Sequence, residues 1–124
     1  MAEKVLIIDD DVDTLRLVGL MLQRQGYLIS AAANGEQGLA KAFEEKPNLI
    51  LLDVMMPDMD GPSTLQLLRS NQATAEIPVI FLTAKVQGSD RKRFAEMGVA
   101  AVLAKPFDPM LLCGQIAEAL GWNI

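Results

Sequence analysis

Four aspartates near the start of the chain are the first residues whose type and spacing suggest chemistry. Asp9, Asp10, Asp11 and Asp13 follow the apolar run Val5–Ile8. Clustered carboxylates repel one another and raise each other's pKa unless a positive charge lies between them. The cluster therefore either spreads into water or holds a cation.

Polar residues also stand at the ends of three later apolar runs. Asp53 ends NLILLD, Thr83 ends VIFLT and Lys105 ends AVLAK. With Asp9 and Asp10 they supply three carboxylates, one hydroxyl and one ammonium. Carboxylates suit Mg²⁺, and a hydroxyl and an ammonium beside the ion suit a phosphoryl group. One carboxylate of such a set can act as a nucleophile and form an acyl phosphate.

The elements that must position these residues alternate along the chain. Val, Ile and Leu in unbroken runs are typical of strands that are covered on both faces. The expected strands are Lys4–Ile8, Tyr27–Ala32, Asn48–Leu52, Pro78–Leu82 and Val99–Ala104. Five helical patterns lie between and after them. The first starts at Leu15 and ends at Gly26, the second starts at Leu39 and ends before Pro47, and the third covers Ser63–Leu68. The fourth covers Ser89–Met97 and is closed by Gly98, and the last starts at Asp108 and Pro109 and ends at Gly121.

This alternation predicts an α/β fold, a doubly wound parallel sheet with helices on both faces. The carboxyl ends of parallel strands lie along one edge of such a sheet, where ligands bind. The five polar residues should therefore meet in one pocket, although the sequence separates the first and the last of them widely.

Composition restricts the classes of function. The chain has 124 residues, of which 51% are hydrophobic, and a net charge of -5. That charge disfavours non-specific nucleic-acid binding, and the lack of a long apolar run disfavours a membrane protein. Histidine is absent, which removes any imidazole-based triad, and the single cysteine, Cys113, suits a reducing compartment. We expect one domain over residues 1–124, without an output domain, in the cytoplasm.

Four motifs in order give the chain a close resemblance to a known family. VLIIDDD, LILLDVMMPDMDG, VIFLTA and AKPF resemble the motifs of a response-regulator receiver domain, the CheY-like phosphoacceptor of two-component signalling. The resemblance covers essentially the whole chain. It implies a flavodoxin-like fold with strand order 2-1-3-4-5 and a site between the first and third strands.

The resemblance also implies roles for individual residues. Asp53 would accept the phosphoryl group, and Thr83 and Lys105 would contact its oxygens. The implied ligands of Mg²⁺, for which Mn²⁺ can substitute, are Asp9, Asp10, Asp53 and the backbone carbonyl of Met55. A cis bond is implied between Lys105 and Pro106.

The implied partners are a sensor histidine kinase or histidine phosphotransfer protein and a downstream effector protein. The chain would be a switch that assists its own phosphorylation and autodephosphorylation, rather than an enzyme. Phosphorylation would reshape the surface of the fourth helix, fifth strand and fifth helix, in a monomer or a phosphorylation-dependent dimer. Val102 departs from the aromatic residue that many receivers carry there, and Met55 and Lys85 occupy positions that tune phosphoryl lifetime in the family.

Other readings of the same residues remain open. Asp11 and Asp13 suit a helix start better than a metal site, and Asp58, Asp60 and Gly61 suit a turn. An EF-hand loop is excluded because Thr14 and Leu20 stand where glycine and glutamate are needed. Two rival functions are a phosphohydrolase of the haloacid-dehalogenase type that uses Asp9, and a pseudo-receiver that binds partners without being phosphorylated.

Overall fold

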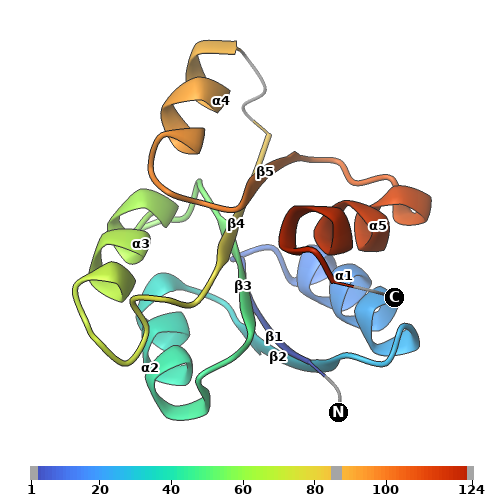
Figure 1. Ribbon diagram of the computed structural model, residues 1–124, viewed down its shortest axis with the longest axis horizontal. Coiled ribbons are helices and arrows are strands. Elements are labelled where there is room, and N and C mark those ends of the chain that lie inside the picture. The colour runs from blue at the N-terminus through green and yellow to red at the C-terminus, as the bar shows by residue number, and fades with distance from the viewer. Residues whose placement is uncertain (1–2, 85–87, 123–124) are drawn as a thin grey trace.

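The fold is a five-stranded parallel sheet between two layers of helices (Figure 1). The computed structural model describes residues 3–84 and 88–122. The strands are β1 (Lys4–Ile8), β2 (Leu28–Ala32), β3 (Leu49–Asp53), β4 (Val79–Thr83) and β5 (Ala101–Ala104). Their order, β2-β1-β3-β4-β5, confirms the predicted flavodoxin-like topology.

Five helices connect and follow the strands. They are α1 (Val12–Arg24), α2 (Gly35–Glu45), α3 (Gly61–Arg69), α4 (Gly88–Ala95) and α5 (Pro109–Leu120). Helices α1 and α5 cover one face of the sheet, while α2, α3 and α4 cover the other (Figure 1). No helix within the described residues is long and apolar enough to cross a membrane.

Successive residues of the central strands supply two separate cores. In β1, Val5 and Ile7 pack with α1 and α5, whereas Leu6 and Ile8 pack with the helices of the opposite face. Side chains of a strand alternate between its two faces, so a strand buried on both sides needs an unbroken apolar run. This requirement explains the apolar runs that the sequence shows.

The ends of several helices follow the sequence signals. The Asp11 carboxylate caps α1 by accepting a hydrogen bond from the Asp13 backbone N–H at 2.9 Å. Gly26 adopts a positive φ of 95° just beyond α1, a conformation that glycine adopts without steric cost. Asp58, with φ 68°, lies in a turn as expected. Asp60 and Gly61, by contrast, form the start of α3 rather than part of that turn.

Several strand boundaries differ from the prediction by one or two residues. Asp53 and Thr83 are the last residues of β3 and β4, and do not follow them. The reason is backbone pairing, since the register of β3 with β4 continues to Asp53. The last strand starts at Ala101 rather than Val99. The Lys105–Pro106 bond is cis, as the resemblance implied.

Candidate functional site

The carboxyl edge of the sheet brings the expected polar residues together. Asp9 comes directly after β1, Asp53 and Thr83 end β3 and β4, and Lys105 directly follows β5. Backbone hydrogen bonds align these strand ends, because the Lys105 N–H donates to the Thr83 carbonyl at 2.9 Å. The positions of these residues therefore follow from the sheet itself.

Three carboxylates form a compact cluster at this edge. Asp9, Asp10 and Asp53 each offer an oxygen, and these oxygens lie within 4.8 Å of one another. Asp9 is fully buried and Asp53 is only 4% exposed, whereas Asp10 faces solvent. Asp11 is not part of this group because it caps α1.

The Lys105 ammonium lies inside the acidic cluster and contacts two of its members. Nζ is 2.6 Å from Asp9 Oδ2 and 3.5 Å from Asp53 Oδ1. The other oxygen of Asp9, Oδ1, accepts a hydrogen bond from the Asp11 backbone N–H at 2.9 Å. Asp9 is thereby the principal partner of the lysine, a pairing that the sequence did not predict.

Burial and neighbouring charges shift the pKa values of Asp53 and Lys105. The pKa of Asp53 rises to about 7, chiefly because the carboxyl is buried and next because Asp9 is negative. Lys105 and the Met55 N–H oppose this rise. Burial by itself would lower the pKa of Lys105, but its hydrogen bond to Asp9 and the two nearby carboxylates raise it overall.

Met55 contacts the Asp53 carboxylate, and Thr83 ends the strand beside it. The Met55 backbone N–H donates to Asp53 Oδ1 at 3.3 Å, and the Met55 side chain is 55% exposed. Thr83 is fully buried at the end of the neighbouring strand. Lys85 lies outside the described residues. Val102 is half-buried against the core on the α2–α4 face.

The site has the chemistry of a divalent-cation site. Three carboxylates with oxygens within 4.8 Å of one another leave negative charge that Lys105 alone does not balance. The raised pKa of Asp53 reflects this excess of negative charge as well as burial. Asp9, Asp10 and Asp53 thus fit a hard cation such as Mg²⁺.

Gly61 packs closely against the backbone at the end of β3, a contact that the sequence did not indicate. Its N–H donates to the Val54 carbonyl at 2.9 Å. A Cβ at this position would lie 2.7 Å from the Asp53 carbonyl oxygen and 2.8 Å from Val54 Cα. The DG pair in the sequence indicated only a turn, and the close approach became visible with the helix in place.

A sheet of this order, with an acidic cluster and a lysine at its carboxyl edge, defines the class of protein. The chain belongs to the response regulator receiver domain family, whose model matches residues 5–117. Receiver domains are generally switches of two-component systems rather than conventional enzymes, and they bind Mg²⁺ through acidic residues.

The chain matches parts of longer relatives. It is 39% identical over 109 residues to the alkaline phosphatase synthesis transcriptional regulatory protein PhoP of Bacillus subtilis, covering 88% of this chain and 45% of that protein. It is 36% identical over 116 residues to the response regulator PleD of Caulobacter vibrioides, covering 94% and 26%. The chain thus spans half or less of the length of these two relatives.

Solved structures share the fold along nearly the whole chain. Chemotaxis protein CheY4 of Vibrio cholerae has a TM-score of 0.90 at 29% identity, covering 96% of this chain and 99% of that one. The receiver domain of sensor histidine kinase PA1611 of Pseudomonas aeruginosa, solved with a magnesium ion coordinated in its active site cleft, has a TM-score of 0.86 at 27% identity, covering 98% and 99%.

Proposed function

We propose that Asp53 accepts a phosphoryl group from a phosphohistidine of a partner kinase or phosphotransfer protein. The observation that carries this proposal is the convergence of three carboxylates and Lys105 around the end of β3. Residues 1–124 contain no histidine, so the donor imidazole lies outside them.

The transfer step needs one nucleophile and a neutralised phosphoryl group. An oxygen of the Asp53 carboxylate attacks phosphorus, the phosphorus–nitrogen bond breaks, and its electron pair leaves with the partner's imidazole. With a pKa of about 7, Asp53 is partly protonated near neutral pH. Deprotonation, favoured by a nearby cation, therefore activates the nucleophile.

A bound Mg²⁺ would supply charge neutralisation for the phosphoryl oxygens. Asp9, Asp10, Asp53 and the Met55 carbonyl are its proposed ligands. Lys105 is 3.5 Å from Asp53 Oδ1, near enough to contact a phosphoryl group attached there. Thr83 ends the adjacent strand, and its hydroxyl is the second proposed contact.

Phosphorylation of Asp53 would add negative charge and acceptor oxygens near the ends of β4 and β5. In the sequence, these two strands are followed by α4 and α5. We propose that this change alters the α4–β5–α5 surface for an effector protein. Val102 lies in β5 and has no ring to rotate, so the readout works through backbone and loop positions. The same proposal predicts a monomer or a phosphorylation-dependent dimer, a cytoplasmic location and no nucleic-acid binding by residues 1–124.

The decisive experiment is intact-mass spectrometry after incubation with acetyl phosphate and Mg²⁺. Wild-type protein should gain one phosphoryl group, about 80 Da, only when Mg²⁺ is present, and Asp53→Asn should gain none. Peptide mapping should locate the group on Asp53. A group on Asp9 would favour the dehalogenase-type phosphohydrolase, and no group even with a phosphorylated kinase would favour the pseudo-receiver.

A further inference from the structure

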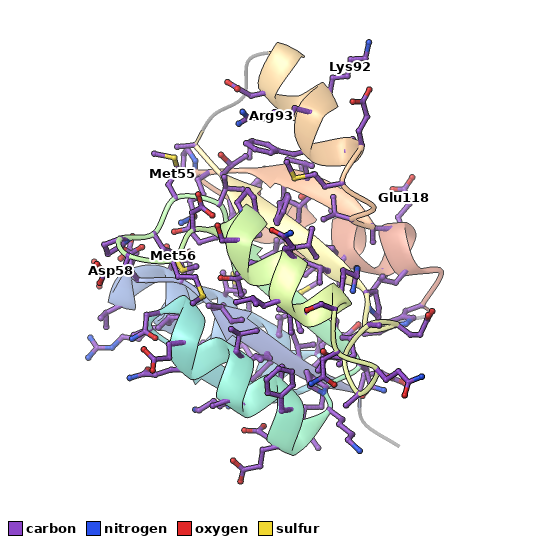
Figure 2. The ribbon with its side chains drawn as sticks, turned by 90° about the vertical axis from the view of Figure 1, so that its left-hand side faces the viewer. Met55, Met56, Asp58, Lys92, Arg93 and Glu118 are labelled. Atoms are coloured by element: carbon purple, nitrogen blue, oxygen red, sulfur yellow. The ribbon has the colours of Figure 1, made fainter. Side chains whose placement is uncertain are left out.

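The loop between β3 and α3 carries three of the seven methionines of the chain. These three are Met55, Met56 and Met59, and the first two differ sharply in exposure. Met55 is 55% exposed, whereas Met56 is 8% exposed. Figure 2 shows Met55 at the outer margin of the molecule. Its thioether therefore meets dissolved reagents that the core of the protein excludes.

The other methionines whose side chains the structure describes are packed against the fold. Met21 and Met97 pack against the cores on opposite faces of the sheet. A Cβ added at Gly35 would lie 2.9 Å from Met59 Sδ, so this sulfur contacts the start of α2. Among the methionine side chains that the structure describes, Met55 alone is exposed. Exposure therefore singles out one thioether of the loop for reaction with a soluble reagent.

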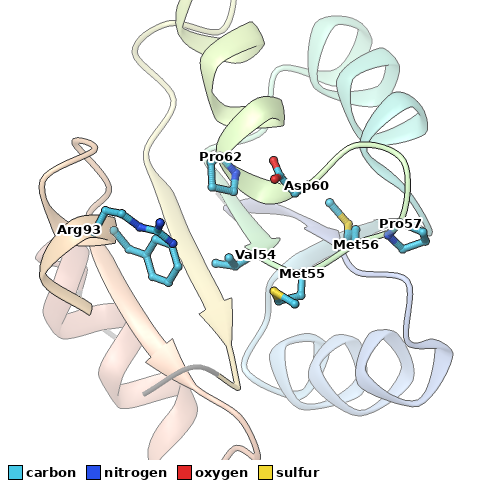
Figure 3. A pocket seen from close by; sticks show the side chains of 8 residues that line it. Val54, Met55, Met56, Pro57, Asp60, Pro62 and Arg93 are labelled. Carbon is cyan, nitrogen blue, oxygen red and sulfur yellow. The ribbon is translucent and has the colours of Figure 1, made fainter. Parts of the chain in front are cut away.

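The backbone of Met55 also connects this residue to the acidic cluster. Its N–H donates a hydrogen bond to Asp53 Oδ1 at 3.3 Å. Its side chain helps to line a pocket of about 500 Å³, together with the apolar residues Met56 and Pro62 (Figure 3). The same residue thus has a thioether that meets solvent and an N–H that contacts a carboxylate of the site. A chemical change of the side chain is therefore placed to affect Asp53.

We propose that Met55 is a modification site, which hydroperoxides oxidise to methionine sulfoxide, and that the sulfoxide disturbs the surroundings of Asp53. A lone pair of the sulfur attacks the terminal oxygen of the hydroperoxide, and the O–O bond breaks as the S–O bond forms. The proton of the transferred oxygen passes to the departing oxygen, which leaves as water or as an alcohol. The sulfur is oxidised and the peroxide is reduced, so no further reactant is needed.

The sulfoxide replaces an apolar side chain with a polar one, whose oxygen carries partial negative charge. Contact with the apolar lining from Met56 and Pro62 becomes less favourable, and the side chain of Met55 turns further into water. This movement shifts the N–H that contacts Asp53, and the new dipole disfavours an anionic phosphoryl group nearby. The effect on phosphorylation rests on the proposed function, whereas the oxidation and its effect on the Asp53 backbone do not.

The first measurement is peptide mapping by tandem mass spectrometry while the folded chain reacts with hydrogen peroxide. Met55 should gain one oxygen, about 16 Da, and fragment ions should distinguish it from Met56. The oxidation of Met55 should be at least about tenfold faster than that of Met56, because exposure controls access of the peroxide. In urea the two rates should become similar. Equal rates in the folded chain would overturn the proposal.

The second measurement compares ¹H–¹⁵N NMR spectra of the chain before and after this oxidation, in the absence of phosphodonor. The amides of Asp53 and Met55 should shift, while the amides of α5 on the opposite face of the sheet should stay in place. An unchanged Asp53 amide would overturn the link to the site. The rate of phosphorylation by acetyl phosphate and Mg²⁺ should then fall at least about twofold in the oxidised chain.

Met55→Leu and its matched control Met59→Leu each exchange one methionine of the loop for an apolar residue of similar size. Met55→Leu should lose the fast oxidation and the shift of the Asp53 amide, whereas Met59→Leu should keep both. Each variant is compared with itself before oxidation, so differences in basal phosphorylation do not enter the comparison. An equal effect of peroxide on Asp53 in Met55→Leu would overturn the proposal. A chain that is not phosphorylated even before oxidation would contradict the proposed function, while mapping and NMR would still decide the modification.

Discussion

The Lys105 ammonium is paired with Asp9 at 2.6 Å, across 96 positions of sequence. Asp9 is fully buried in this pair, and Lys105 is 20% exposed. The lysine that we propose as a phosphoryl contact is thus already held by a carboxylate of the acidic cluster. This arrangement links the stability of the fold to the chemistry of the site.

Replacing the lysine should therefore destabilise the protein. Lys105→Met should cost about 3 kcal/mol at pH 7 without divalent ions, because it leaves the Asp9 charge buried and unbalanced. Urea unfolding measures this cost. The control is Lys92→Met, at an exposed position of α4, for which we expect a change within about 0.5 kcal/mol. Equal costs for the two variants would contradict a stabilising role for the pair.

The raised pKa of Asp53 predicts a pH dependence of stability. The folded protein holds the Asp53 proton up to about pH 7, whereas the unfolded chain releases it near the ordinary value of 3.8. The folded state then binds more protons between these values, so its stability falls as the pH rises through this window. Asp53→Asn lacks this loss and should be more stable than wild type by on the order of 2 kcal/mol at pH 8.

The measurement is urea unfolding of both proteins at several pH values with a chelator present. The advantage of Asp53→Asn should shrink steadily toward pH 4, where the wild-type carboxyl is protonated in both states. An advantage that does not change with pH would show that Asp53 titrates normally.

Magnesium should make the wild-type protein more stable than Asp53→Asn. A cation that binds the folded state stabilises it by mass action, by about 2.7 kcal/mol at a hundred times the dissociation constant. Wild type should gain most of this amount, and Asp53→Asn much less, because one of three clustered carboxylates is missing. Thermal unfolding with MgCl₂, MnCl₂ or NaCl at equal ionic strength checks the prediction, and an equal gain in NaCl would attribute it to screening.

Replacing each of two glycines with alanine separates an effect on the site from an effect of helix propensity. Gly61→Ala should destabilise the protein by about 1–3 kcal/mol and slow phosphorylation, because its Cβ would press on the Asp53 backbone. Gly114→Ala, in α5 with nothing within 4 Å of the added Cβ, should instead stabilise by about 0.5–1 kcal/mol. Phosphorylation rates from intact-mass time courses and urea unfolding test both. Unchanged phosphorylation in Gly61→Ala would remove the positioning role.

The alternation of apolar runs and helical patterns was sufficient to predict the architecture. Side chains alternate across each strand, so unbroken runs such as Val5–Ile8 require cover on both faces, which leaves few arrangements other than a doubly wound sheet. Local signals also predicted that Asp11 lies at a helix start and that Gly26 ends that helix. Strand ends were less predictable, because pairing between neighbours rather than local composition kept Asp53 and Thr83 within their strands.

By itself, the sequence determined which residue types lie at the carboxyl edge, since chain order and strand ends decide that. Only the tertiary structure decided how those residues pair, because distances between side chains from different strands depend on register and packing. It placed Lys105 on Asp9 and set Gly61 against the backbone of Asp53. Each of these contacts joins segments that no local pattern relates, so each appears only when the sheet and its helices are packed.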